Sequence, residues 1–330
     1  MKVIDIREIE GFSIGQTENA AAGTGCTVVL CKDGARAGLD VRGGGPASRD
    51  TRILDPLMAA QQIHAVVLAG GSAFGLGAAD GVMRLLEESG IGFDVGVAKV
   101  PLVPQSDIFD LTVGDSKVRP DAAMGHEAAR LAMDAPNYRS GNFGAGCGAT
   151  VGKALGMEYC TKTGIGSWAV QTGELKIGAV VVLNALGDVF DFRSGKQIAG
   201  LLSEDKKSFR SSSDALKSKI DVNDNRYAAF GGEGTVTNTT LAVVITNADL
   251  SKAQLCKIAG MAHDGYARSI APVHSSADGD SIYAISAGSV KADQDVVGVL
   301  AAEAVSMAII NAVESAESAY GFPAAKDLGL

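Results

Sequence analysis

The segment Thr237–Asn247 places a polar turn directly before a strongly apolar run. Asn238, Thr239 and Thr240 precede Leu241–Ile245, in which every residue is apolar. A short apolar run rich in β-branched residues, bounded by polar residues, predicts a core strand. The chain must therefore bury this strand in a sizeable core while holding two threonine hydroxyls at the point where the strand begins.

A threonine in this position has a chemical use. Its hydroxyl could attack the peptide carbonyl before it and free its own α-amine, which would make it an N-terminal nucleophile. A free α-amine has a pKa of about 7.7–8.0 and can serve as the base that a weak hydroxyl nucleophile needs. Two other readings stay open, because threonines are common in strands and because Asn238-Thr239-Thr240 is also a glycosylation sequence.

Composition limits the class of protein and its partners. The 330 residues are 46% hydrophobic and include 42 glycines, which is enough for a large core in one big domain or two intimate ones. The formal net charge is -9, without a block of lysine and arginine, so we expect no nucleic-acid partner.

The N-terminus and the cysteines indicate a compartment. Met1–Arg7 has no apolar core of the kind found in signal peptides, and no uninterrupted apolar run reaches membrane-spanning length. The five cysteines are odd in number and form no CxxC pair, which is typical of buried thiols in a reducing cytoplasm. We therefore expect a cytoplasmic protein with no membrane partner, which also argues against glycosylation of Asn238.

Strand and helix patterns mix along the whole chain. A hairpin is predicted over Gly25–Val41, with its turn at Lys32–Gly34, and a charged loop or partly helical excursion over Ser203–Asn225. The other predicted strands are His64–Leu68, Leu175–Ala185 and Ser281–Ser286, and the predicted helices are Ala78–Glu88, Ala122–Ala132, Lys252–Ser269 and Asp295–Ser315. This mixture predicts an α+β or layered αββα fold.

Several motifs resemble known sites but are incomplete. Gly144–Ala149 lacks the strand–helix unit of a dinucleotide site, and Gly148–Lys153 is one residue short of a P-loop. Gly70–Phe74 lacks the second glycine of a nucleophile elbow. Asp278-Gly279-Asp280 lacks the further oxygen ligands of a calcium loop, and the histidines lack ligand spacing, so we expect no metal.

Three further residues could have either a purely structural or a functional role. Lys153 ends a segment of small residues and is either a surface lysine or part of a site. Asn184 follows a buried strand and is either a turn former or a donor to an oxyanion. His274 lies close to the aspartate pair and could line a site, although packing is the usual role of such a histidine.

Taken together, these motifs resemble one family. Arg42-Gly43-Gly44, Gly70–Leu76, Gly144–Gly146 and Asn238-Thr239-Thr240 resemble the DmpA-type aminopeptidases, which are self-processing N-terminal nucleophile hydrolases. The likeness runs from about Gly11 to Asn311. Aminopeptidase members have Gly-Ser at the cut and Ser-x-Glu downstream, whereas this chain has Asn-Thr and Asp-x-Asp. The departure favours the nylon-oligomer hydrolase branch of the family.

The resemblance implies a fold and a set of roles. It implies a four-layer αββα sandwich of the type shared with ornithine acetyltransferases, formed by one domain over 1–330 that is cut before Thr239 into an α fragment, 1–238, and a β fragment, 239–330. It implies Thr239 as nucleophile with Lys153 beside it, Asn184 on the oxyanion side, and Asp278 and Asp280 orienting the nucleophile. Phe109 aligns with a family tyrosine and lacks its hydroxyl, so we expect a packing role.

The implied reaction is hydrolysis of short oligoamides or peptides, including 6-aminohexanoate oligomers or N-terminal amino acid amides. The partner would be a small-molecule amide, without cofactor or metal, and the protein a homo-oligomer, either tetramer or octamer. Two alternatives stay open: acyl transfer of the ornithine acetyltransferase type, and non-catalytic binding of a nucleotide or phosphate by the Gly144–Lys153 loop.

Overall fold

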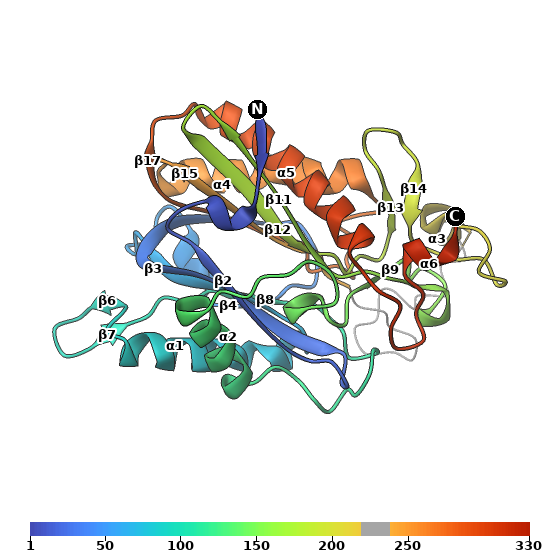
Figure 1. Cartoon of the computed structure of the whole chain (residues 1–330), viewed down its shortest axis with the longest axis horizontal. Helices are drawn as coiled ribbons and strands as arrows, with labels where there is room; N and C mark the ends of the chain where they lie inside the picture. Colours follow the sequence, from blue (N-terminus) through green and yellow to red (C-terminus); the bar gives the residue numbers. More distant parts are fainter. Residues whose placement is uncertain (219–237) are drawn as a thin grey trace.

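The computed structural model describes residues 1–218 and 238–330. Its main feature is a ten-stranded sheet with strand order β1-β11-β12-β15-β17-β3-β5-β8-β4, in which β2 also pairs with β3 (Figure 1). The strands are β1 (Lys2–Ile4), β2 (Ser13–Asn19), β3 (Thr24–Val41), β4 (Ala47–Arg49), β5 (Ile63–Ala69), β8 (Gln105–Asp107), β11 (Ile165–Thr172), β12 (Leu175–Val182), β15 (Leu241–Ala248) and β17 (Ser281–Val290).

Strand β3 joins the two halves of this sheet. Its first half pairs with β2 and β5, and its second half pairs with β17. The pairing with β5 shifts between Leu30 and Ala35, and Gly34 there has a φ of +85°, as in a glycine bulge. The predicted hairpin is therefore wrong: Lys32–Gly34 is an irregularity within one 18-residue strand, because both halves find partners elsewhere.

Helices cover the two halves of the sheet. In Figure 1, α4 and α5 lie on one side of the molecule and α1 and α2 on the opposite side. One apolar cluster joins α4 and α5 to β11, β12, β15 and β17, and a second joins α1 and α2 to β3 and β5. A third cluster joins strands of one half of the sheet to strands of the other. The helices are α1 (Ala78–Glu88), α2 (Ala122–Asp134), α4 (Lys252–Ser269) and α5 (Gln294–Glu314).

The predicted helices are confirmed, two of them to the residue. Helices α1 and α4 have the predicted bounds, and Ser251 and Gln254 form the expected capping box of α4. Helix α5 is buried around most of its circumference, as its composition indicated. Its length and hydropathy would allow it to cross a membrane, but 72% of its most apolar window is buried inside the protein.

Shorter elements connect the main ones. The predicted excursion is a loop followed by α3 (Ser212–Lys217), and its part from 219 to 225 lies outside the described residues. The remaining strands are β6 (Phe93–Asp94), β7 (Lys99–Val100), β9 (Thr150–Val151), β10 (Thr161–Lys162), β13 (Asp188–Phe190), β14 (Gln197–Ala199) and β16 (Ile270–Ala271). The remaining helices are η1 (Ile6–Glu8), η2 (Thr51–Leu54), η3 (Ser72–Gly77), η4 (Gly144–Gly146), η5 (Met157–Tyr159) and α6 (Ala325–Leu328).

Candidate active site

Three strand ends meet at one edge of the sheet. Strand β15 runs antiparallel to β12 and parallel to β17, so the end of β12 lies beside the beginnings of β15 and β17. Asn184 follows β12, Thr239 precedes β15, and Asp280 directly precedes β17. Topology therefore brings together residues that are far apart in the sequence, and all three are buried.

Thr239 lies against the carbonyl group that it would have to attack. Its side chain is buried, and its hydroxyl donates a short hydrogen bond to the Asn238 carbonyl oxygen. The same carbonyl oxygen accepts the Gly279 N–H at 3.2 Å. The Thr239 N–H donates to the Asn184 carbonyl oxygen at 2.9 Å. Both sides of the Asn238–Thr239 peptide bond are thus held by hydrogen bonds.

Lys153 reaches the same place from the glycine-rich segment. It is 2% exposed, so the surface reading of this lysine is wrong. Its Nζ donates to the Asn184 side-chain oxygen at 2.6 Å and lies 3.3 Å from the Asn184 carbonyl oxygen. The Asn184 side-chain oxygen also accepts the Thr150 N–H, and its amide nitrogen donates to the Phe109 carbonyl oxygen at 3.1 Å.

The two aspartates are held by different partners. Asp280 accepts the Thr240 N–H at 2.8 Å on one oxygen and the His274 ring Nδ1 at 2.8 Å on the other. Asp278 accepts the N–H and the hydroxyl of Ser275. Asp280 thus holds the main chain at Thr240, next to the threonine, whereas Asp278 is held by Ser275.

Burial shifts the pKa values of this group. Burial lowers the pKa of Lys153 to about 8, against the effects of the Cys160 thiol and of the carboxylates of Asp278 and Asp110. Burial, and after it the charge of Asp280, raises the pKa of Asp278 to about 6. Both groups therefore change charge within about two pH units of neutrality, as acid–base groups in catalysis commonly do.

The glycine motifs allow the segments around the site to approach closely. A Cβ at Gly43 would lie 2.3 Å from the Asp280 nitrogen, and one at Gly279 would lie 2.6 Å from the Thr239 hydroxyl oxygen. Gly71 donates its N–H to Asp110 at 2.7 Å, and a Cβ at Gly70 would overlap the same carboxylate. These close approaches explain why the chain uses glycine at these places.

Some polar groups near the site were not predicted from the sequence. Lys162 is fully buried and donates to the carbonyl oxygens of Gly146, Ala149 and Thr163. Burial raises the pKa of Asp110 to about 6. A lysine at the end of a two-residue strand and a backbone N–H, that of Gly279, leave no local sequence pattern that could have identified them.

The Gly144–Lys153 loop does not have the geometry of a phosphate site. The Lys153 ammonium is occupied by Asn184, and the lysine is followed by a turn and by η5 rather than by the N-terminus of a long helix. Within residues 1–218 and 238–330, no three His, Cys, Asp or Glu side chains gather to hold a metal ion.

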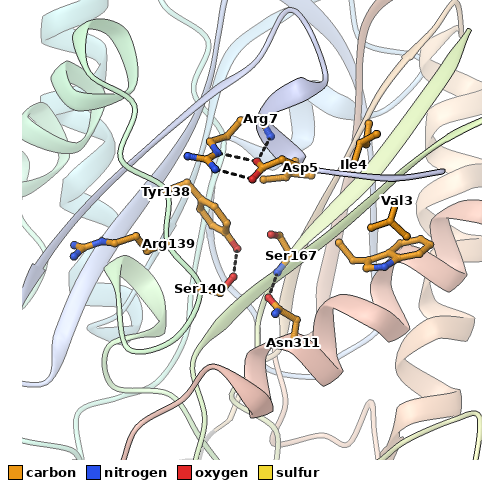
Figure 2. A pocket seen from close by; sticks show the side chains of 11 residues that line it. Val3, Ile4, Asp5, Arg7, Tyr138, Arg139, Ser140, Ser167 and Asn311 are labelled. Atoms are coloured by element: carbon orange, nitrogen blue, oxygen red, sulfur yellow. Dashed lines mark hydrogen bonds and ion pairs between the residues drawn. The ribbon is translucent and has the colours of Figure 1, made fainter.

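A surface hollow of about 330 Å³ lies elsewhere, between β1, the segment 138–140 and β11 (Figure 2). Asp5 and Arg7 form an ion pair among its lining residues, and the hydroxyls of Tyr138 and Ser140 are hydrogen-bonded to each other. Thr239, Lys153, Asn184 and the two aspartates are not among its lining residues. We place the chemistry at the buried threonine rather than in this hollow, because the Thr239 hydroxyl lies against a peptide carbonyl group, with the side chains of Lys153 and Asp280 bound to neighbouring residues of the site.

Relatives with known names share almost the whole chain. A family model described as Peptidase family S58 matches residues 5–326. An uncharacterised aminopeptidase of Mycobacterium leprae (strain TN) is 37% identical over 348 residues, covering 96% of this chain and 92% of the relative. The 6-aminohexanoate-oligomer endohydrolase of Agromyces sp. (strain KY5R) is 29% identical over 279 residues, covering 84% and 73%.

Solved structures show a shared fold. The L-aminopeptidase D-Ala-esterase/amidase of Ochrobactrum anthropi, described as a variant of the Ntn hydrolase fold, superposes with a TM-score of 0.66 at 18% identity, covering 94% of this chain and 86% of that one. A Burkholderia sp. beta-aminopeptidase gives 0.63 at 19% identity, covering 95% and 87%. The fold is thus a mixed α/β fold of the Ntn hydrolase type, and the chain belongs to peptidase family S58, whose members hydrolyse amide bonds.

Proposed function

We propose that this chain cuts its own Asn238–Thr239 bond, and that the freed Thr239 then hydrolyses short oligoamides or peptides. The observation that carries the proposal is the Thr239 hydroxyl lying against the Asn238 carbonyl group, which also accepts the Gly279 N–H. The proposed substrate class includes 6-aminohexanoate oligomers and N-terminal amino acid amides, because a relative named as a 6-aminohexanoate-oligomer endohydrolase and one named as an aminopeptidase share most of this chain.

Maturation would proceed by an acyl shift. The Thr239 Oγ attacks the Asn238 carbonyl carbon, the C–N bond breaks, and the hydroxyl proton passes to the departing nitrogen, which leaves an ester. Water then hydrolyses the ester to give the Asn238 carboxylate and the free Thr239 hydroxyl and amine. The Gly279 N–H supports this step, because a backbone donor on the scissile carbonyl stabilises the negative charge that develops there.

Turnover would use the new α-amine as base. The amine nitrogen is held by the Asn184 carbonyl oxygen, which Lys153 also approaches. A neighbouring ammonium disfavours protonation of the amine and so keeps it available as a base near neutral pH. Thr239 Oγ attacks the substrate carbonyl while the amine accepts its proton, and water releases the acyl group in a second step.

Asn184 and the aspartates would orient these groups. The amide nitrogen of Asn184 donates to Phe109 in the uncut chain, so its proposed contact with a substrate oxyanion requires exchange of that bond. Asp280 holds the main chain at Thr240, and Asp278, behind it, balances the charge of Lys153. No step needs a metal or an organic cofactor.

The proposed cut would leave two fragments that stay together. The β fragment, 239–330, contributes β15, β17, α4 and α5, and the α fragment, 1–238, contributes the neighbours β12 and β3. Because β15 and β17 lie between β12 and β3 in the sheet, separation of the fragments would expose the core. We further propose that the layers stack as αββα within this single domain, with the three apolar clusters between them.

We extend the proposal to the oligomeric state of the protein and to the cellular compartment in which it acts. The β6–β7 hairpin exposes apolar side chains that a second copy of the chain would cover, namely Phe93, Val95 and Val97. We propose a homo-oligomer, tetramer or octamer, acting in the cytoplasm, where all five cysteines would stay reduced, as in this structure.

The activity is tested with purified, matured protein and two substrate sets, linear 6-aminohexanoate oligomers and aminoacyl p-nitroanilides, with Thr239→Ala as the inactive control. We expect hydrolysis of at least one set and none by the control. An added amine acceptor tests acyl transfer: a transfer product that outweighs the free acid would replace hydrolysis by the transferase alternative. Failure of both reactions, or equal activity of the control, would contradict the proposal.

A further inference from the structure

His274 holds the carboxylate that fixes the nucleophile strand. Two of its groups meet one oxygen of Asp280, the backbone N–H at 3.0 Å and the ring Nδ1 at 2.8 Å. The other oxygen of that carboxylate accepts the Thr240 N–H. An ionised carboxylate can only accept hydrogen bonds, so the ring carries a proton on Nδ1.

The backbone of His274 is adapted to this double contact. Its φ is +59°, in the left-handed region that a residue other than glycine adopts only at a cost. This conformation lets the N–H and the ring of the same residue reach the same oxygen. Such strained positions persist where the surrounding structure enforces them, and they are frequent at functional sites.

The ring is also held from behind by helix α4. It packs edge-on against the ring of His263, with centroids 4.8 Å apart, and lies 6.0 Å from the ring of Tyr266. His263 is fully buried, and its Nε2 lies 3.1 Å from the Asp40 carbonyl oxygen. Burial lowers the pKa of His263 to about 4, so this ring adds no positive charge behind His274 near neutral pH.

We infer that His274 is a positioning residue for the self-cleavage and hydrolysis reactions, acting through Asp280 on the main chain at Thr239–Thr240. The inference rests on the proposed function. Gly279, next to Asp280 in the chain, donates to the scissile Asn238 carbonyl oxygen, so a shift of Asp280 would disturb the nucleophile and the carbonyl group together. His274 lies on the side of Asp280 away from Thr240 and limits that shift.

Two substitutions separate the ring donor from the backbone. His274→Gly keeps the backbone N–H and accepts the left-handed φ, but it removes the ring donor. His274→Asn also accepts this φ and places an amide N–H close to the position of Nδ1. Both remove the imidazole ring and its contact with His263, so the difference between them reports mainly the hydrogen bond to Asp280.

The experiment measures the rate of self-cleavage of refolded chain, and then kcat and KM of the matured protein. We expect His274→Gly to lower the cleavage rate and kcat by about 10- to 100-fold, the range typical of groups that orient a reactive side chain or ligand, with little change in KM. His274→Asn should recover most of this loss. Equal rates for His274→Gly and unmutated protein, or equally slow rates for both variants, would overturn the inference.

A spectroscopic measurement covers the case in which His274→Gly does not fold. In the uncut Thr239→Ala chain we expect a histidine Nδ1–H proton resonance that exchanges slowly with water and disappears in the double variant with His274→Asn. Absence of such a resonance contradicts the inference. Lack of cleavage of the unmutated chain would instead contradict the proposed function, so the two failures are distinguishable.

Discussion

The Thr239 nitrogen and the Lys153 ammonium share one acceptor, the carbonyl oxygen of Asn184, at 2.9 and 3.3 Å. In the uncut chain the Thr239 nitrogen belongs to the peptide bond, and after the proposed cut it becomes the α-amine that acts as base. In the uncut chain, the Asn184 carbonyl oxygen therefore already holds the nitrogen that would become the base close to the Lys153 ammonium. In the proposed mechanism, the groups that hydrolysis would use are therefore already in place before the cut.

The pH dependence of maturation should follow Asp278 and Lys153. The uncut chain has no α-amine at Thr239, so this amine does not contribute to the profile. Asp278, whose pKa is about 6, should lose its function as it is protonated on acidification, and Lys153, whose pKa is about 8, as it is deprotonated in alkali. In freshly refolded chain, we expect the self-cleavage rate plotted against pH to be bell-shaped, with its acidic and alkaline limbs near these pKa values. A rate that is constant across both limbs would contradict these roles.

Asn184→Asp should move the alkaline limb of the pH profile of self-cleavage to higher pH. The substitution places a carboxylate 2.6 Å from the Lys153 ammonium, which favours the charged lysine and raises its pKa. It also removes the amide hydrogen bond that holds Asn184 to the Phe109 carbonyl oxygen, so the groups that Asn184 positions should shift and the maximum rate should fall by about 10-fold or more. The pH profile of self-cleavage measures both effects. An alkaline limb unchanged from that of the unmutated chain would show that Lys153 does not set it.

Gly279→Ala should slow self-cleavage by about 100-fold or more, because the added Cβ would lie 2.6 Å from the Thr239 hydroxyl oxygen and displace the nucleophile. Gly77→Ala is the matched control, because a Cβ there meets no atom within 4 Å and its φ is -67°. Band densities on denaturing gels over time give both rates. Equal rates for the two variants would mean that the observed position of the hydroxyl is not the reactive one.

Lys162→Met should destabilise the fold in a pH-dependent way. It removes the donor to three buried carbonyl groups, which we expect to cost about 2 kcal/mol or more. Burial lowers the pKa of Lys162 to about 7, below its value in the unfolded chain of about 10.4. The unfolded chain thus binds more protons between these values, so the stability of the unmutated protein should rise with pH there.

The variant lacks this rise, so its deficit should widen from about pH 7 to about pH 10. Denaturant unfolding at several pH values measures the deficit. Lys257→Met, on the exposed side of α4, is the control for replacing a lysine by methionine and should change the free energy of unfolding only slightly. A deficit for Lys162→Met that is independent of pH would contradict the lowered pKa.

Local patterns predicted the elements better than their pairing. The apolar run after Thr240, the capping box at Ser251 and the spacing in α1 all gave correct elements, because each depends on neighbouring residues. The hairpin over Gly25–Val41 was wrong, because β5 and β17, distant in the sequence, pair with the two halves of β3. Turn residues at Lys32–Gly34 could not reveal those partners.

In the site, too, some residues could be identified from the sequence, whereas the partners that surround them could not. Thr239 could be singled out because a hydroxyl follows an asparagine directly before an apolar run, and Asp278 and Asp280 because they resemble the acidic pair of the family. The order β12-β15-β17, which brings them to Asn184, depends on long-range pairing. The Gly279 N–H is a backbone group, and the buried Lys162 donates to backbone carbonyl oxygens. Neither contact could be predicted from the residue type.

The bond before Thr239 is proposed to break without another protein. Intact mass spectrometry of the chain refolded in isolation, alongside Thr239→Ala, shows whether it does. We expect two fragments of about 24 and 9 kDa by proportional share of 33.6 kDa, the smaller beginning Thr239-Thr240-Leu241, and a single full-length chain for the variant. An unmutated chain that stays whole while hydrolysing amides, or a variant that is cut at the same bond, would contradict the account.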